Sequence, residues 1–132
     1  MDKSLLTTFP YRQNPEGLYF PIIPIRIFHK PILINSTALI DSGATISVFR
    51  PDVASDLNLK IETGKEIFLG GVGGRIKGYL HKLKIEVSGK NFVSPIVFSY
   101  EYFVSFNLLG RQAFFEKFRV CFDEKSKKIK LE

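Results

Sequence analysis

One carboxylate in the sequence stands where an apolar strand would end and a tight turn would begin. The stretch LIDSGATIS, residues 39–47, places Asp41 after an apolar run and follows it at once with Ser42 and Gly43. Glycine lets backbone N–H groups approach the carboxylate without a side-chain clash, and the serine hydroxyl can fix the loop by hydrogen bonding. Considered alone, the stretch fits an ordinary strand-to-turn junction as well as an active site.

The chemistry that such a carboxylate could perform is the hydrolysis of a peptide bond. Water attack needs a base that takes a proton from water and an acid that protonates the amide side. Two carboxylates about 3 Å apart can do both, because like charges that close cannot both ionise. The other aspartates, none followed by Ser-Gly or Thr-Gly, are Asp2, Asp52, Asp56 and Asp123. A working pair therefore needs Asp41 from each of two copies, that is, a homodimer.

A second candidate segment is the glycine-rich stretch IFLGGVGGRIKGYL, residues 67–80. Its centre, which can bend and expose backbone N–H groups, consists of Gly70, Gly71, Val72, Gly73 and Gly74. A flap that closes over a site and a plain flexible hairpin are both open interpretations. A phosphate-binding loop would need a helix directly after the glycines, whereas residues 76–87 have a strand pattern.

The elements that must position these residues are mostly strands. Leu83, Ile85 and Val87 alternate with charged residues, which predicts a half-buried strand that ends at residues 88–91. Pro21 and Pro24 interrupt the apolar residues 18–28, which favours an edge or bulged strand. Further β segments are expected at residues 31–40 and 92–104 and as a hairpin over 120–131 around residues 123–127.

Two short stretches favour helices. Residues 49–59 (FRPDVASDLNL) place Pro51 and Asp52 where a helix would begin. Residues 107–118 (NLLGRQAFFEKF) pass from the apolar pair Leu108-Leu109 through Gly110 into a helical pattern. The sequence therefore predicts a mostly β fold with one or two short helices.

Length and composition predict a single domain. At 132 residues the chain is long enough for one core, with residues 1–17 expected as a loosely ordered lead-in and 18–132 as the domain. The net charge of +6 is scattered, and its one cluster, Lys125 to Lys130, is typical of a solvated chain end. We expect no nucleic-acid partner, although binding through the basic surface stays an alternative.

Further composition arguments concern the setting and the ligands. Cys121 is alone, so the chain forms no internal disulfide, and a reducing compartment, the cytoplasm, is expected. No apolar run has the length of a signal peptide core or a membrane span. His29 and His81 lack metal-ligand spacing with Cys121, so no metal and no cofactor is expected.

Three motifs in this order resemble the retropepsins, the single-domain aspartic proteases of retroviruses and their cellular relatives. They read LIDSGA, then FLGGVGGRIKG, then NLLGRQAF, and the resemblance covers roughly residues 20–120. It implies a closed, barrel-like β domain that acts as a homodimer, with Asp41 catalytic and Ser42, Gly43 and Ala44 supporting the loop. It also implies that Val72 lies at the tip of a substrate-binding flap.

The resemblance extends to the third motif, with one departure. It implies that Leu108, Leu109 and Gly110 pack behind the catalytic loop. Arg111 matches an arginine that in retroviral enzymes pairs with an aspartate just after Asp-Thr/Ser-Gly-Ala, a position held here by Thr45. The leading hypothesis is an aspartic endopeptidase that cuts extended polypeptides, and the alternative is a silent retropepsin-like module for dimerisation or peptide binding.

Overall fold

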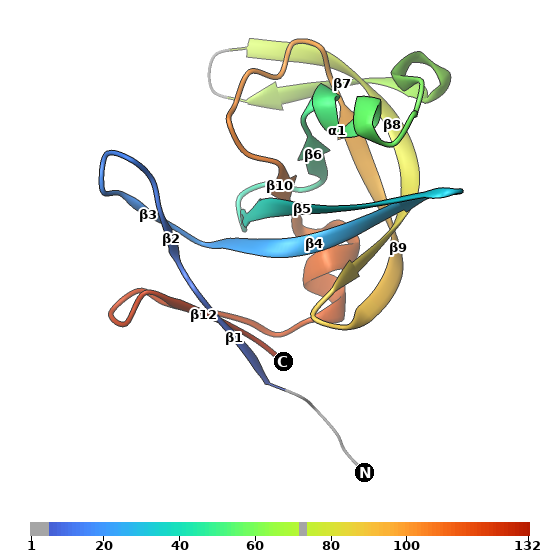
Figure 1. Ribbon diagram of the computed structural model, residues 1–132. Coiled ribbons are helices and arrows are strands. Elements are labelled where there is room, and N and C mark those ends of the chain that lie inside the picture. The colour runs from blue at the N-terminus through green and yellow to red at the C-terminus, as the bar shows by residue number, and fades with distance from the viewer. Residues whose placement is uncertain (1–5, 72–73) are drawn as a thin grey trace.

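The computed structural model describes residues 6–71 and 74–132 and shows a β-rich domain with three short helical segments (Figure 1). The strands are β1 (Thr7–Pro10), β2 (Arg12–Gln13), β3 (Tyr19–Phe20), β4 (Ile22–His29), β5 (Ile32–Ile40), β6 (Ser47–Phe49), β7 (Lys65–Gly71), β8 (Gly74–Val87), β9 (Lys90–Phe98), β10 (Leu108–Leu109), β11 (Val120–Asp123) and β12 (Lys128–Leu131). The helical segments are α1 (Pro51–Asp56), η1 (Ile61–Thr63) and η2 (Arg111–Phe115). The mostly β prediction is confirmed.

Seven strands form the main sheet in the order β4-β5-β10-β6-β9-β8-β7. Strand β4 also pairs with β8. The six strands β4, β5, β10, β6, β9 and β8 therefore form a closed ring of pairings. β10 runs parallel to β5, and β6 runs parallel to β9, while the hairpin neighbours are antiparallel. The short strand β10 thereby joins the end of β5 to β6 in the middle of the sheet.

The alternating segment around residue 85 forms the last part of the long strand β8. Leu83, Ile85 and Val87 are at most 5% exposed, and the strand ends at Val87 as the pattern predicts. Ser88 and Gly89 make the turn into β9, and both have positive φ angles. The inward residues of β8 and β9, Phe98 among them, belong to the same core cluster as Phe49 and Phe114, and these three phenylalanines are among its largest fully buried side chains.

The proline-containing segment 18–28 is split into β3 and β4. Pro21 separates the two strands, and Pro24 lies in the part of β4 that pairs only with β5. A missing N–H is tolerated where one side of a strand has no neighbour. The expected edge strand is therefore found for residues 22–25, while residues 26–28 gain β8 as a second neighbour.

The helix predicted at residues 49–59 is confirmed as α1. Pro51 lies in the first turn together with Asp52, and Val53 and Ala54 bury the inner side. The second helical pattern gives η2, which is interrupted at Gln112 and Ala113, the latter with a φ of 68°. Both segments are short, as expected.

Two local expectations were wrong. Residues 99–104 continue as a loop because the Ser99 hydroxyl donates to the Lys77 carbonyl and accepts from the Glu101 N–H, which turns the chain away from the sheet. The loosely ordered lead-in expected for residues 1–17 contains β1, which pairs with β12, and β2, which pairs with β3. Their polar composition hid these strands. Tyr11, which lies between β1 and β2, reaches the core at 7% exposure.

The C-terminal hairpin is confirmed. β11 and β12 pair antiparallel, with Val120 opposite Leu131 at one end and Asp123 opposite Lys128 at the other. β1 adds a third strand on the other side of β12. Within the described chain, none of the helices is long and apolar enough to cross a membrane.

Candidate active site

Strand pairing fixes the position of Asp41. β5 ends at Ile40, and the Asp41 N–H donates to the Leu109 carbonyl at 3.0 Å. This bond continues the parallel register of β10 along β5, in which Leu109 is the partner of Ile40. Leu109 is fully buried, whereas the Asp41 residue is half-buried. The aspartate is thus anchored through its backbone at the point where the apolar strand ends.

The loop after Asp41 folds back onto the aspartate. The Gly43 N–H donates to the Asp41 Oδ1 at 2.9 Å, and the Ala44 N–H donates to the Asp41 carbonyl at 3.2 Å. A Cβ at position 43 would lie 3.3 Å from Oδ1, so a larger residue would crowd the carboxylate. Ser42 is exposed, and its hydroxyl has no hydrogen-bond partner among the residues that the structure describes. Its role in fixing the loop stays a prediction.

The chain that carries Gly110 passes directly behind this loop. A Cβ at Gly110 would lie 2.6 Å from the Ile46 carbonyl oxygen and 2.8 Å from that of Ala44. The Gly110 N–H donates to the buried Ser47 Oγ at 3.0 Å, and the Arg111 N–H donates to the Ala44 carbonyl at 2.8 Å. Glycine is required here because backbone atoms occupy the space of any side chain.

Asn107 links three segments around the site, a role that sequence reasoning missed. Its side-chain Oδ1 accepts from the Arg50 N–H at 2.8 Å, and its Nδ2 donates to the Thr37 carbonyl at 2.9 Å. Its own carbonyl accepts from the Leu39 N–H at 2.7 Å. Because Asn107 is 5% exposed, these bonds fix the end of β6 and the entry to β10 against β5.

The loop over residues 99–107 brings a tyrosine toward Asp41. The Tyr102 hydroxyl donates to the Phe106 carbonyl at 2.6 Å, and the Arg50 Nη1 donates to the Val104 carbonyl at 3.2 Å. Burial raises the pKa of Tyr102 to about 12; the Arg50 charge opposes this rise and the Asp41 charge adds to it. Tyr102 therefore keeps its proton at ordinary pH. Phe103, in the same loop, is 89% exposed.

The glycine-rich segment forms the hairpin of β7 and β8 (Figure 1). Gly70 pairs with Arg75 and Gly71 with Gly74, while Val72 and Gly73 lie outside the described residues. A Cβ at Gly70, Gly71 or Gly74 would meet no described residue within 4 Å, so the described part of this hairpin end has open space around it. A strand follows the glycines, so the helix that a phosphate-binding loop needs is not there.

Among the described residues, the retroviral ion pair has no counterpart. Across residues 6–71 and 74–132, no carboxylate lies within 4 Å of the Arg111 guanidinium, and the Arg111 residue is exposed. Backbone bonds hold the two segments together instead, since the Gln112 N–H donates to the Thr45 carbonyl at 2.9 Å. The departure at Thr45 therefore leaves the backbone contact in place.

The remaining described aspartates belong to other elements. Asp52 pairs with Arg50 at 3.0 Å in the first turn of α1, and Asp56 ends that helix. Asp123 accepts from the Ser126 N–H in the C-terminal hairpin. The loop of residues 41–44 therefore carries a single carboxylate in this chain.

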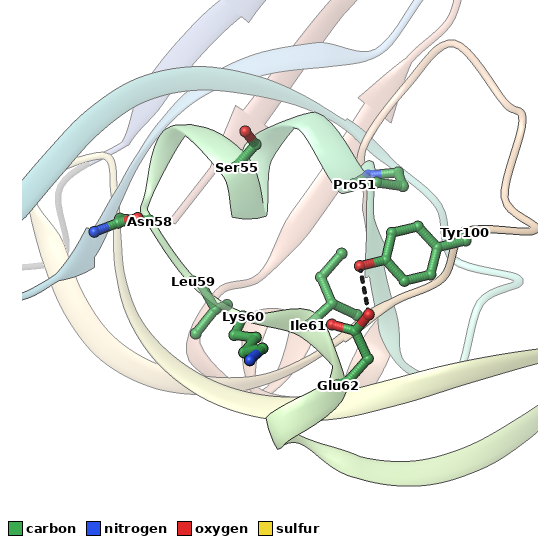
Figure 2. A pocket seen from close by; sticks show the side chains of 8 residues that line it. All are labelled: Pro51, Ser55, Asn58, Leu59, Lys60, Ile61, Glu62 and Tyr100. Atoms are coloured by element: carbon green, nitrogen blue, oxygen red, sulfur yellow. Dashed lines mark hydrogen bonds between the residues drawn. The ribbon is translucent and has the colours of Figure 1, made fainter.

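A hollow of about 450 Å³ lies between α1, η1 and Tyr100 (Figure 2). Its lining consists of Pro51, Ser55, Asn58, Leu59, Lys60, Ile61, Glu62 and Tyr100, and the Tyr100 hydroxyl donates to the Glu62 Oε2 at 3.1 Å. None of these residues belongs to the Asp41 loop, the glycine hairpin or the Leu108-Leu109-Gly110 segment. The hollow is thus separate from the candidate site.

The comparison with protein families agrees with the site geometry. The aspartyl protease family matches residues 23–111, which is well over half of the chain and includes the first two motifs and the NLLGR part of the third. The comparison with curated proteins gave no match. The resemblance to retropepsins is confirmed, and the chain belongs to the retropepsin-like aspartyl protease family.

Proposed function

We propose that the protein is an aspartic endopeptidase that works as a homodimer, with one Asp41 from each copy. The observation that carries the proposal is the arrangement of Asp41, whose backbone is tied to Leu109 and whose Oδ1 accepts from the Gly43 N–H. This leaves a half-buried carboxylate at a rigid strand end, where a second copy can bring its own Asp41. Membership of the family supports the peptide bond as the substrate.

The two carboxylates would share one proton and hold a water between them. One Asp41 acts as general base toward that water, and the other protonates the amide nitrogen that leaves. Aspartic protease dyads are the established example of such sharing, and the pair titrates as a unit. The chain holds a single Asp-Ser-Gly sequence, which is the reason for placing the site between two copies.

The β7–β8 hairpin is the proposed flap. The described part of its glycine-rich end has open space around it, and β7 is the last strand of the main sheet, with β8 as its neighbour. A peptide in extended form can lie beneath such a hairpin and be enclosed when the hairpin closes. The exposed loop with Phe103 offers apolar surface for side chains next to the cut bond.

The test is cleavage of a denatured protein substrate by the wild type and by Asp41→Asn between pH 4 and 7. We expect cleavage by the wild type and its loss in the variant, because asparagine cannot carry the shared proton. Asp56→Asn, at an exposed helix end, is the matched control and should cleave as the wild type does. Equal cleavage by the wild type and Asp41→Asn would refute the assignment.

The second candidate function is a silent module for dimerisation or peptide binding. It is motivated by Thr45, which stands in place of the usual acid, and by the exposed Arg111. Binding of a pepstatin-like inhibitor distinguishes the two functions. An active enzyme should bind the inhibitor through Asp41, and Asp41→Asn should abolish this binding. A silent module should bind the inhibitor equally well as wild type and as Asp41→Asn, or should not bind it in either form.

A further inference from the structure

The long strand β8 parts from its neighbour β9 close to Lys77. The last pair between the two strands joins Tyr79 to Phe98, and among the described strands residues 74–78 pair only with β7. In the same register, a continued β9 would place Tyr100 opposite Lys77. Because β9 ends at Phe98, that pair does not form. The β7–β8 hairpin therefore begins to project from the rest of the sheet at this point.

Two side chains take the place of the missing backbone pair. The Ser99 Oγ donates to the Lys77 carbonyl at 2.5 Å, and the Lys77 N–H donates to the Glu101 Oε1 at 3.1 Å. The Glu101 N–H in turn donates to the Ser99 Oγ at 3.0 Å. Both backbone groups of Lys77 are thus held by Ser99 and Glu101, the residues on either side of Tyr100. We call these two side chains the clamp.

The clamp is attached to a closely packed part of the core. Ser99 is fully buried. Next to Lys77, a Cβ at Gly78 would lie 2.5 Å from the Val97 Cγ1 and 3.2 Å from a carbonyl oxygen of β9, so the two strands approach each other closely. The residue Glu101, in contrast, is exposed. Its side chain can therefore be replaced without opening the core.

The clamp also begins the loop that leads to the strand of Asp41. The Tyr102 N–H donates to the Ser99 carbonyl at 3.2 Å, which forms the first turn of this loop. The loop ends at Asn107, whose carbonyl accepts at 2.7 Å from the N–H of Leu39, two residues before Asp41. Figure 1 shows the loop, which follows β9, next to the β7–β8 hairpin. One loop therefore connects the base of the hairpin with the strand that carries the carboxylate.

We propose that the clamp couples the β7–β8 hairpin to the loop over residues 99–107, and that Glu101 is a positioning residue for substrate capture. This inference rests on the proposed peptidase function, in which the hairpin is the flap, and adds a residue to it. The clamp fixes the base of the hairpin relative to the strand of Asp41. Without the Glu101 acceptor, the hairpin takes up more orientations, and a smaller fraction of molecules is ready to enclose a peptide.

The test compares three variants of the full chain. Glu101→Ala removes the acceptor of the Lys77 N–H, whereas Glu101→Gln keeps an acceptor oxygen in the same place. Glu62→Ala is the matched control, because Glu62 is also exposed and accepts a hydrogen bond of the same 3.1 Å length from the Tyr100 hydroxyl. Glu62 lines the hollow that is separate from the candidate site.

The first measurement is the hydrogen-exchange rate of the Lys77 amide, followed by NMR, which does not depend on activity. We expect this amide to exchange about fivefold faster or more in Glu101→Ala, because its hydrogen bond is lost. Glu101→Gln and Glu62→Ala should exchange as the wild type does. A wild-type exchange rate of the Lys77 amide in Glu101→Ala would overturn the clamp.

The second measurement separates KM from kcat on a peptide substrate. Glu101→Ala should raise KM about threefold or more and lower kcat by a smaller factor, because fewer molecules hold the hairpin ready. Glu101→Gln should restore KM, and Glu62→Ala should leave it unchanged.

The outcomes separate the inference from the proposed function. Faster exchange of the Lys77 amide with an unchanged KM would refute the positioning role of Glu101 and leave the peptidase function standing. A wild type that cleaves no peptide would refute the proposed function, and the role of Glu101 in substrate capture with it. The exchange rate of the Lys77 amide would still decide whether the clamp holds the base of the hairpin.

Discussion

At the scale of single residues, Ser47 joins the two sides of the candidate site through a buried hydrogen bond. Its hydroxyl oxygen accepts from the Gly110 N–H at 3.0 Å, and Ser47 is fully buried. Replacement by alanine leaves that N–H without a partner, so we expect Ser47→Ala to lower the free energy of unfolding by about 1–3 kcal/mol. Urea denaturation measures the change.

The control for this prediction is Ser55→Ala on the exposed side of α1, which should change stability by less than about 0.5 kcal/mol. Ser47→Thr keeps the oxygen and should recover part of the loss. Equal stability of Ser47→Ala and the wild type would show that the Gly110 N–H finds another partner.

The sequence alone identifies Asp41 and Gly43 as residues of interest because their signal is local. A carboxylate, a hydroxyl and a glycine follow each other after an apolar run. Asn107 carries no such signal, since its bond to Arg50 joins residues 57 positions apart. Tyr102 likewise reads as one aromatic among many until the loop brings it near Asp41. Contacts of this kind depend on the completed fold.

At the scale of elements, the crossing of the β10–η2 segment behind the Asp41 loop depends on Gly110. A Cβ there would lie 2.6 Å from backbone atoms of Ile46, which cannot move aside as a flexible side chain could. We therefore expect Gly110→Ala to destabilise the fold by about 1–3 kcal/mol. The loss of activity should exceed the loss of folded protein, because the loop that holds Asp41 is displaced.

Gly70→Ala is the matched control, since a Cβ at that position meets no atom of the described residues within 4 Å. It should leave the free energy of unfolding within about 0.5 kcal/mol of the wild type. A Gly110→Ala protein with wild-type stability and activity would contradict the close passage of the two segments.

Elements with a regular pattern are predictable from the sequence, and those fixed by distant partners are not. The alternation of apolar and charged residues that ends at Val87 correctly predicts a strand, and the proline at the start of α1 correctly predicts a helix. β1 is missed because its neighbour is β12, at the other end of the chain. The strand expected through residue 104 stops at Phe98, where the bonds of the Ser99 side chain turn the chain.

At the scale of the whole molecule, the hydrogen bond from Tyr11 to Glu124 ties the two ends of the chain together and makes stability depend on pH. This bond is the main cause that holds the pKa of Glu124 below its ordinary 4.5, so its contribution is present above pH 4.5 and is lost as pH falls through the lowered pKa. Burial, followed by this bond, raises the pKa of Tyr11 to about 12, so the contribution of Tyr11 is present below pH 10 and lost between pH 10 and 12.

We therefore expect the stability difference between the wild type and Tyr11→Phe to form a plateau near neutral pH and to shrink toward both extremes. The free energy of unfolding of both proteins, measured from pH 3 to 12, gives this difference. The contributions of the other titrating groups are the same in both proteins and cancel in this difference. A difference that stays constant over the whole range would contradict the assigned bond.

The central claim is that each active site contains two Asp41 carboxylates from two copies. The activity per wild-type chain, measured while Asp41→Asn chains are mixed in and allowed to exchange, tests this claim directly. Mixed dimers have one carboxylate, so the activity per wild-type chain should fall to about half in an equal mixture and to about a tenth at ninefold excess. An activity per wild-type chain that stays constant at every mixing ratio would contradict the shared site.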